Sequence, residues 1–314
     1  MTLTSLLFPL FGSIFLGAGS RGLKLFDGED ARRMSRFVFM ISMPFAGFEF
    51  MRRSQVDGEI ILGLAGGYVV SLLIVTAAVF VLSRSLLKLT VREAGAAVFC
   101  TTCGNAIFLG IPIAASVEGW ASPFLILVLF EGTLVFAIGT ALMTWPREGS
   151  ERGSLQSALA ALGRASLRAA TNPIVIGTVL GLIASLTALS LPEPVDRFLA
   201  FTARTAGPLG LFVLGVSAAD LLLSGKASEL KGAGLLLPFK LLIFPALTAA
   251  LVYLFTGDPT ATSVAALFTG LPPAVASIVL ASVYKQWVSG TAGVVTVGTI
   301  IGLMTLTLYL VFIL

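Results

Sequence analysis

Apolar segments long enough to cross a lipid bilayer follow one another along almost the whole chain. A spanning helix needs about 20 apolar residues at about 1.5 Å each. Of the 314 residues, 57% are hydrophobic and only 11% are charged, so no stretch remains for a soluble domain. The sequence therefore predicts an all-α integral membrane protein with ten spans. These spans lie at roughly 3–20, 34–51, 60–83, 93–116, 121–145, 169–190, 198–221, 232–256, 261–283 and 289–313.

The distribution of the 20 Lys and Arg residues predicts how the spans are oriented. Fifteen of them lie in the connections between spans 1–2, 3–4, 5–6, 7–8 and 9–10, and four lie on the other side. By the positive-inside rule the first set is cytoplasmic, so both termini face outward. This placement also explains the net charge of +4 without a nucleic-acid partner. The N-terminal run lacks a basic n-region and a small-residue cleavage site, which favours a first span over a removable signal. We expect a multi-pass protein of the inner (plasma) membrane.

Two of the apolar segments are interrupted by residues that break helices. The fourth contains CGNAIFLGIP at 103–112, and the ninth contains FTGLPP at 268–273. Pro removes a backbone donor and clashes with the preceding turn, and Gly and Asn tolerate non-helical dihedrals. Unwound backbone at membrane depth must line a cavity or be buried in protein, and paired interruptions mark the substrate site in secondary transporters. The pair therefore predicts a transporter. The alternative for Pro112 and Pro273 is a simple kink.

Corresponding residues recur in the two halves of the chain at nearly one interval. Pro173 follows Pro9 by 164 residues, and Pro208 follows Pro44 by the same interval. A Gly-Thr pair in spans 5 and 10 recurs after 166 residues, and the last prolines of the two interruptions after 161. Chance is the alternative, because Pro and Gly are frequent in membrane helices. Four matches in the same order nevertheless favour a duplicated five-span unit.

The duplication predicts three parts of the chain: a first five-span repeat at 1–145, a cytoplasmic linker at 146–168 and a second repeat at 169–314. An odd number of spans per unit places the second repeat upside down, so a pseudo-two-fold axis in the membrane plane relates the two. This symmetry makes the broken spans 4 and 9 cross near the midplane. The N-terminal ends of their half-helices carry partial positive charge, so we expect an anion to bind there.

Several of these segments resemble the auxin efflux carrier family, to which plant PIN proteins and bacterial carboxylate permeases belong. The resemblance covers nearly the whole chain and lies in GNAIFLGIP at 104–112, NP at 172–173, GPLGLFVLG at 207–215, KLLIFP at 240–245 and LPPA at 271–274. It implies a ten-span fold like that of sodium/proton antiporters and bile-acid symporters, with spans 3–5 and 8–10 as a transport core and spans 1, 2, 6 and 7 as a scaffold. It also implies transport of small organic anions by an elevator-like movement, and a homodimer through the scaffold. The long hydrophilic loop of the plant carriers is missing, which indicates the short bacterial branch.

The predicted substrate site lies at the two interruptions. Asn105 offers one acceptor and two donors to a carboxylate, and the resemblance makes its position a substrate contact; helix stabilisation is the alternative role. The other residues predicted to bind substrate are Gly104, Pro112, Gly270, Pro272 and Pro273.

A second tier of polar residues lies close to the interruptions or to the linker. Thr101, Thr102 and Thr269 precede the breaks, although Thr in a membrane helix more often bonds its own backbone. Asn172 before Pro173 is typical of a cap or turn. These four residues are secondary candidates for the site.

Two charged residues, Glu131 and Lys240, lie inside predicted spans at similar depths. Glu131 is about 15 Å from the outer end of span 5 and Lys240 about 12 Å from the cytoplasmic end of span 8. A lone charge at the helix centre costs about 2.5 to 3.5 kcal/mol, so such residues usually pair or line an aqueous path. We hypothesise that they form an ion pair whose protonation, or whose exchange of partner with the substrate, couples transport to protons. Alternatively, Lys240 acts alone or snorkels while Glu131 is protonated. Sodium is the nearest rival coupling ion.

Other classes of function lack their sequence signals. Cys100 and Cys103 have the spacing of a redox or zinc motif, but without His or further Cys a four-ligand zinc site cannot form within one chain, and no metal or cofactor is expected. No GxxxxGK[ST] motif is present, so ATP does not drive transport directly. Without His, the usual catalytic arrangements of a nucleophile with a base cannot form, and we expect no enzyme. A channel or sensor remains an alternative, because broken helices also line selectivity filters.

Overall fold

The computed structural model describes residues 3–53, 58–145, 173–223 and 230–313 of the chain. Every regular element among these residues is an α-helix or a short π-helical segment, and none of them forms a strand. Up to residue 145 the elements are α1 (Leu3–Gly22), α2 (Gly28–Phe37), η1 (Val38–Ser42), α3 (Met43–Arg52), α4 (Gly58–Ser85), α5 (Val91–Thr102), η2 (Ala106–Gly110), α6 (Ile111–Ser116), α7 (Ala121–Phe130), η3 (Glu131–Val135) and α8 (Phe136–Met143).

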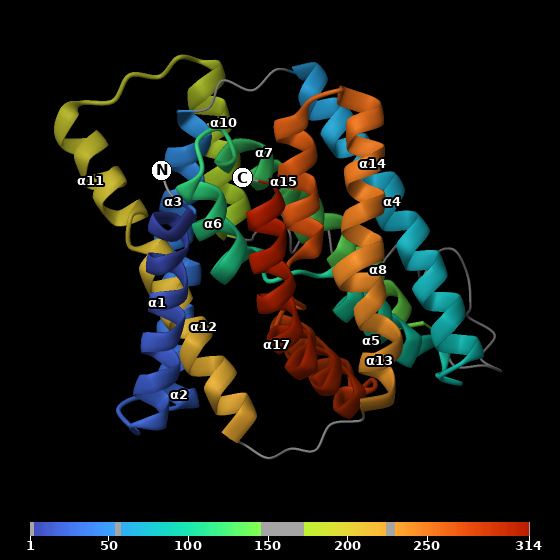
Figure 1. Ribbon diagram of the computed structural model, residues 1–314. Coiled ribbons are helices and arrows are strands. Elements are labelled where there is room, and N and C mark those ends of the chain that lie inside the picture. Colours follow the sequence, from blue (N-terminus) through green and yellow to red (C-terminus); the bar gives the residue numbers. More distant parts are fainter. Residues whose placement is uncertain (1–2, 54–57, 146–172, 224–229, 314) are drawn as a thin grey trace.

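The second half of the chain continues in the same style of long helices and short interruptions. Its elements are α10 (Pro173–Leu186), α11 (Glu193–Ala203), α12 (Ala206–Leu223), α13 (Leu230–Pro238), η4 (Phe239–Ile243), α14 (Phe244–Thr256), α15 (Pro259–Gly270), α16 (Ala276–Tyr284) and α17 (Val288–Ile313). In Figure 1, α1, α2, α3, α11 and α12 gather on the left and α4, α5, α8, α13 and α14 on the right, with α6, α7, α15 and α17 between them.

Five helical stretches of the described residues are long and apolar enough to cross a membrane: Glu59–Ser85, Ala121–Met143, Glu193–Asp220, Gly232–Thr256 and Val288–Val311. Two shorter apolar helices, Ala106–Ser116 and Pro173–Leu186, accompany them. Large apolar side chains are exposed along the outside of the helices, as lipid contact requires, among them Phe8, Leu16, Leu180 and Leu254. The described residues thus form an all-helical protein with several apolar helices of spanning length.

Three of the four described π-helical segments are followed directly by a proline in the first turn of the next α-helix. These prolines are Pro44, Pro112 and Pro245. A proline ring clashes with the carbonyl of the preceding turn, and the wider π turn makes room for it, so the helix continues. Pro112 is therefore not where the fourth segment breaks. The break comes earlier, at residues 103–105, between α5 and η2.

Helix α2 begins at a capping box in a polar connection. The Asp27 carboxylate accepts hydrogen bonds from the backbone N–H groups of Glu29 and Asp30, at 2.8 and 2.9 Å, and the Asp30 carboxylate accepts one from the Asp27 N–H. The N–H groups of Asp30 and Glu29 hold the pKa of Asp27 below its usual value. Such a cap fixes where the helix starts, and hence the direction in which its arginine side chains point.

Glycines allow two pairs of helices to approach closely. A Cβ at Gly17 of α1 would overlap the carbonyl oxygen of Phe212 in α12, and a Cβ at Gly181 of α10 would overlap that of Phe48 in α3. Small residues permit such backbone contact between membrane helices. Gly181 follows Gly17 by 164 residues, and Phe212 follows Phe48 by 164. The two helix pairs therefore pack through corresponding residues of the two halves.

Candidate functional site

The two interrupted segments lie against each other inside the protein. We call this contact the crossing; it consists of residues 103–105 and 271–275. The backbone N–H of Asn105 donates to the carbonyl of Pro272 at 2.9 Å, and the N–H of Ala274 donates to the carbonyl of Cys103 at 3.2 Å. Gly104 and Pro273 form an antiparallel bridge. Each broken segment thus satisfies backbone groups of the other, which lipid could not do.

Asn105 is the last residue of the break in the first broken segment, and its side chain lines a cavity. Its backbone carbonyl accepts hydrogen bonds from the N–H groups of Leu109 and Gly110, both at 3.1 Å, and so starts the next helix. The residue is 6% exposed, and its side-chain amide neither donates a hydrogen bond to nor accepts one from any described residue. The amide is therefore available to a ligand.

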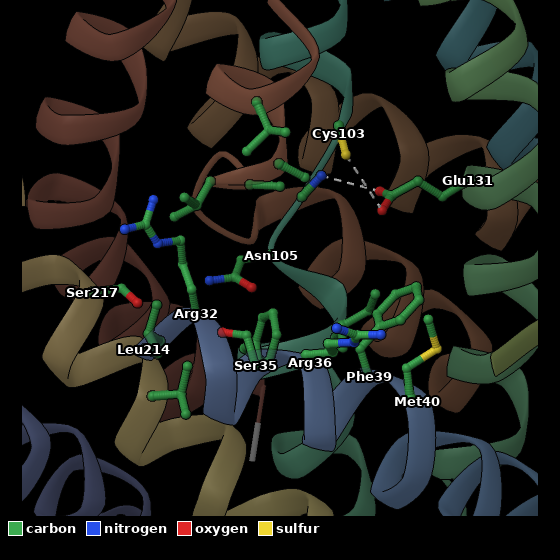
Figure 2. Close-up of a pocket in the computed structure, with 18 of the residues that line it drawn as sticks. Arg32, Ser35, Arg36, Phe39, Met40, Cys103, Asn105, Glu131, Leu214 and Ser217 are labelled. Carbon is green, nitrogen blue, oxygen red and sulfur yellow. Dashed lines mark hydrogen bonds between the residues drawn. The ribbon is translucent and has the colours of Figure 1, made fainter. Parts of the chain in front are cut away.

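Glu131 holds the crossing from one side. Its carboxylate accepts a hydrogen bond from the backbone N–H of Gly104 at 3.1 Å, and the Cys103 thiol lies 3.9 Å from its other oxygen (Figure 2). The carboxylate is almost buried and lies at the start of η3. Hydrogen bonds to a charged acceptor are stronger than those between neutral groups, so Glu131 fixes the unwound backbone at Gly104.

Lys240 approaches the same glycine from another side. Its side chain is fully buried in η4, and its Nζ has no hydrogen-bond partner among the described residues. The Nζ lies 5.6 Å from the centroid of the Phe244 ring, a cation–π distance. A Cβ at Gly104 would come within 3.3 Å of it. Within the described chain, Lys240 and Glu131 make no direct ion pair, contrary to the hypothesis from the sequence; the backbone at Gly104 lies beside both.

Tyr68 of α4 adds a polar group that sequence reasoning missed. It is fully buried, and its hydroxyl finds no partner in the described part of the protein. Its ring stacks on Phe244 with centroids 6.3 Å apart and meets Phe268 edge-on at 5.7 Å. The aromatic cluster around the Lys240 ammonium therefore contains one more unsatisfied polar atom.

A cavity of about 430 Å³ opens beside the crossing. Pockets of about 300–1,000 Å³ are typical of small-molecule sites. Figure 2 shows the Asn105 side chain next to the side chains of α2, with Glu131 pointing toward Cys103. The lining residues come from four places: Arg32, Ser35, Arg36, Phe39 and Met40 from α2 and η1; Cys103, Gly104, Asn105, Ile107 and Phe108 from the first broken segment; Glu131, Phe136, Val213, Leu214 and Ser217 from η3, α8 and α12; and Ala274, Val275, Ala276 and Val279 from the second broken segment.

Four of the residues predicted to bind substrate do not line this cavity. Pro112 is buried next to Gly207, and Gly270 packs against Tyr309. Pro272 and Pro273 pack against glycines of α17, and their backbone forms the crossing. Their role is to shape the broken segments. Ala274 and the residues after it form the wall instead.

The three described second-tier residues do not line the cavity either. The hydroxyls of Thr101, Thr102 and Thr269 each donate to the carbonyl four residues earlier in their own helix, at 2.8 Å. This is the alternative that the sequence left open for them. Asn172 lies outside the described residues.

The α2 side of the cavity was not predicted. Arg32 and Arg36 are one helical turn apart, and both face the cavity. Their positive charges contributed only to the predicted orientation of the spans in the membrane. Their spacing of four residues next to an apolar run was the available signal, because residues at this spacing share one face of a helix. That this face meets the broken segments depends on how distant helices pack.

Comparison with known proteins identifies the family of this chain. The family described as membrane transport protein matches residues 2–310. The chain is 28% identical over 319 residues to a Rhizobium meliloti (strain 1021) protein named "Putative malonate transporter", with 98% of this chain and 96% of the relative covered. The resemblance to the auxin efflux carriers is thereby confirmed. The protein belongs to the membrane transport protein family, and it is a multi-pass membrane transporter.

Proposed function

We propose that this protein is a secondary active transporter of small organic anions and that it recognises their carboxylate group. The observation that carries the proposal is the cavity beside the crossing, where the Asn105 amide lacks a partner among the described residues. A polar group withdrawn from water costs free energy unless it is hydrogen-bonded, and an amide NH₂ suits a carboxylate. Two arginines in the same cavity favour negative cargo. The printed name of the relative, a malonate transporter, is in line with this class.

We also propose the ten-span layout with inverted repeats at 1–145 and 169–314. The matched contacts of Gly17 with Phe212 and of Gly181 with Phe48 support it, because an internal two-fold relation produces each helix contact twice. With both termini outside, the connection that precedes α2 is cytoplasmic. The cavity wall formed by α2 then lies towards the cytoplasm, and the structure corresponds to an inward-facing state.

We propose that transport occurs by an elevator-like movement, and the elements that line the cavity support this proposal. Asn105 and Glu131 belong to the proposed core of spans 3–5 and 8–10, whereas α2 and α12 belong to the proposed scaffold. A substrate in the cavity is therefore held between the two groups. Movement of the core along the scaffold would carry Asn105, and the anion bound to it, across the membrane.

Coupling to protons is proposed to act through Glu131. A substrate carboxylate that took over the N–H of Gly104 would displace the Glu131 carboxylate, which now accepts that bond. A buried carboxylate that loses its donor is more stable with a proton, and Lys240 on the other side of Gly104 modulates that balance. Sodium coupling is the alternative, and an imposed sodium gradient in place of a pH gradient distinguishes the two.

Binding is tested by a thermal-shift screen of the purified protein against mono- and dicarboxylates and indole acids. A ligand at 100 times its Kd stabilises the folded state by about 2.7 kcal/mol, so a carboxylate substrate is expected to raise the Tm. Asn105→Ala should abolish the shift. Thr101→Val should keep it, because that hydroxyl bonds only its own helix. A protein that responds to no anion would contradict the proposal.

A further inference from the structure

We infer that Arg36 binds the second carboxylate of a dicarboxylate whose first carboxylate is held at Asn105. The inference rests on the proposed carboxylate transport and deepens it by naming the substrate class and a residue that selects it. It depends on the distribution of charge along the cavity.

Arg36 is the cation of the cavity wall that the described protein leaves without a counter-ion. Its neighbour Arg32 lies 2.5 Å from a carboxylate oxygen of Glu29, and Arg33 lies 3.5 Å from the other oxygen of the same group. No described carboxylate pairs with Arg36, although it faces the cavity from the same helix. A guanidinium has a fork of N–H donors that matches a carboxylate with two parallel hydrogen bonds. Arg36 is exposed and has no carboxylate partner among the described residues, so its guanidinium is accessible to an anion that enters the cavity.

The opposite end of the cavity carries little net charge. Glu131 and Lys240 lie on two sides of Gly104, and their formal charges cancel. Asn105 is neutral and offers hydrogen bonds only. That end suits one carboxylate held by hydrogen bonds, whereas the α2 side supplies an excess of positive charge. A dianion satisfies both ends, and a monocarboxylate leaves Arg36 without a partner.

Much of the cavity wall is apolar. Phe39, Phe108 and Leu214 are among the side chains that form it. Such side chains suit the hydrocarbon link between the two carboxylates of a dicarboxylate. The serine hydroxyls of the lining, Ser35 and Ser217, lie on α2 and α12. The lining therefore suits a dicarboxylate with its hydrocarbon part against the apolar side chains.

The test compares malonate with propionate, which has the same three-carbon skeleton but one carboxylate. Isothermal titration of the purified protein is expected to show malonate binding about ten- to hundredfold more tightly, the range of a hydrogen bond to a charged group. Arg36→Gln should reduce malonate affinity to that of propionate and leave propionate within about threefold. Arg36→Lys should keep part of the preference, because it retains the charge but not the fork.

Arg33→Gln is the matched control. It removes the same charge from the same helix, but Arg33 does not line the cavity. The control should keep the full preference for malonate. Two outcomes overturn the inference: a preference that survives Arg36→Gln, or an equal loss in Arg33→Gln, which would assign the effect to the general field of α2. If neither acid binds the unmodified protein, it is the proposed carboxylate transport that fails.

Discussion

At Gly104 the backbone has two buried charged side chains beside it, and this residue explains much of the site. The N–H of Gly104 donates to Glu131, and the Nζ of Lys240 lies close to where a side chain would start. Removing an ion from water costs several kcal/mol in a protein. The hydrogen bond and the cation–π contact with Phe244 offset part of that cost. The Nζ of Lys240 has no hydrogen-bond partner among the described residues, and the proposed coupling rests on this incomplete compensation.

Substitution of either charge tests the proposed coupling at this scale. Glu131→Gln keeps an oxygen that can accept the Gly104 N–H but cannot be ionised, and Lys240→Met removes the cation. Transport into proteoliposomes by either variant should no longer respond to an imposed pH gradient. Glu118→Gln removes an exposed carboxylate and serves as the control that keeps the response. Full gradient dependence in both Glu131→Gln and Lys240→Met would rule out this coupling.

Only part of this arrangement could be predicted from the sequence. Glu131 and Lys240 were expected to pair because they lie at similar depths in the membrane. The depth of a residue along a helix does not determine the direction in which its side chain points around the helix axis. Both residues lie in π-helical segments, whose wider turns change the face on which a side chain lies. A direct ion pair was expected. In the structure Glu131 instead accepts a hydrogen bond from the N–H of Gly104, and the Nζ of Lys240 lies on another side of the same glycine.

At the scale of elements, the close helix contacts at glycine support the proposed symmetry. Helix α1 lies on α12 and α3 on α10, with backbone against backbone at Gly17 and Gly181. The break of the fourth segment shows the limits of pattern reading at this scale. The sequence predicted that helix-breaking residues interrupt it, but the π turn absorbs Pro112, and the chain unwinds at residues 103–105 instead.

Alanine substitution in α1 measures the close contact. Gly17→Ala places a methyl group against the Phe212 carbonyl and should destabilise the protein by about 1–3 kcal/mol, the usual cost of overpacking. Gly19→Ala in the same helix meets nothing within 4 Å and should be neutral or stabilise by up to about 1 kcal/mol. Thermal unfolding in detergent distinguishes them. Equal melting temperatures for the two variants would show that the contact is looser than described.

At the scale of the whole molecule, the cavity joins parts of the chain that are far apart in sequence. The composition predicted an all-helical membrane protein, and the interruptions singled out Asn105, which lines the cavity. Arg36 was missed because it comes to line the same cavity as Asn105 only when α2 packs beside the broken segments. A local pattern indicates which residues are unusual, whereas tertiary packing decides which of them share a cavity.

The central claim is that the cavity at Asn105 is the substrate site of a carrier. It is tested most directly by counterflow in proteoliposomes loaded with unlabelled malonate and diluted into labelled malonate. A carrier exchanges the two, so labelled malonate should accumulate inside transiently above its equilibrium level, and the rate of its uptake should saturate with malonate concentration. Thr101→Val should show the same accumulation, and Asn105→Ala should not. Flux that does not saturate and is the same in Asn105→Ala as in the unmodified protein would contradict the account.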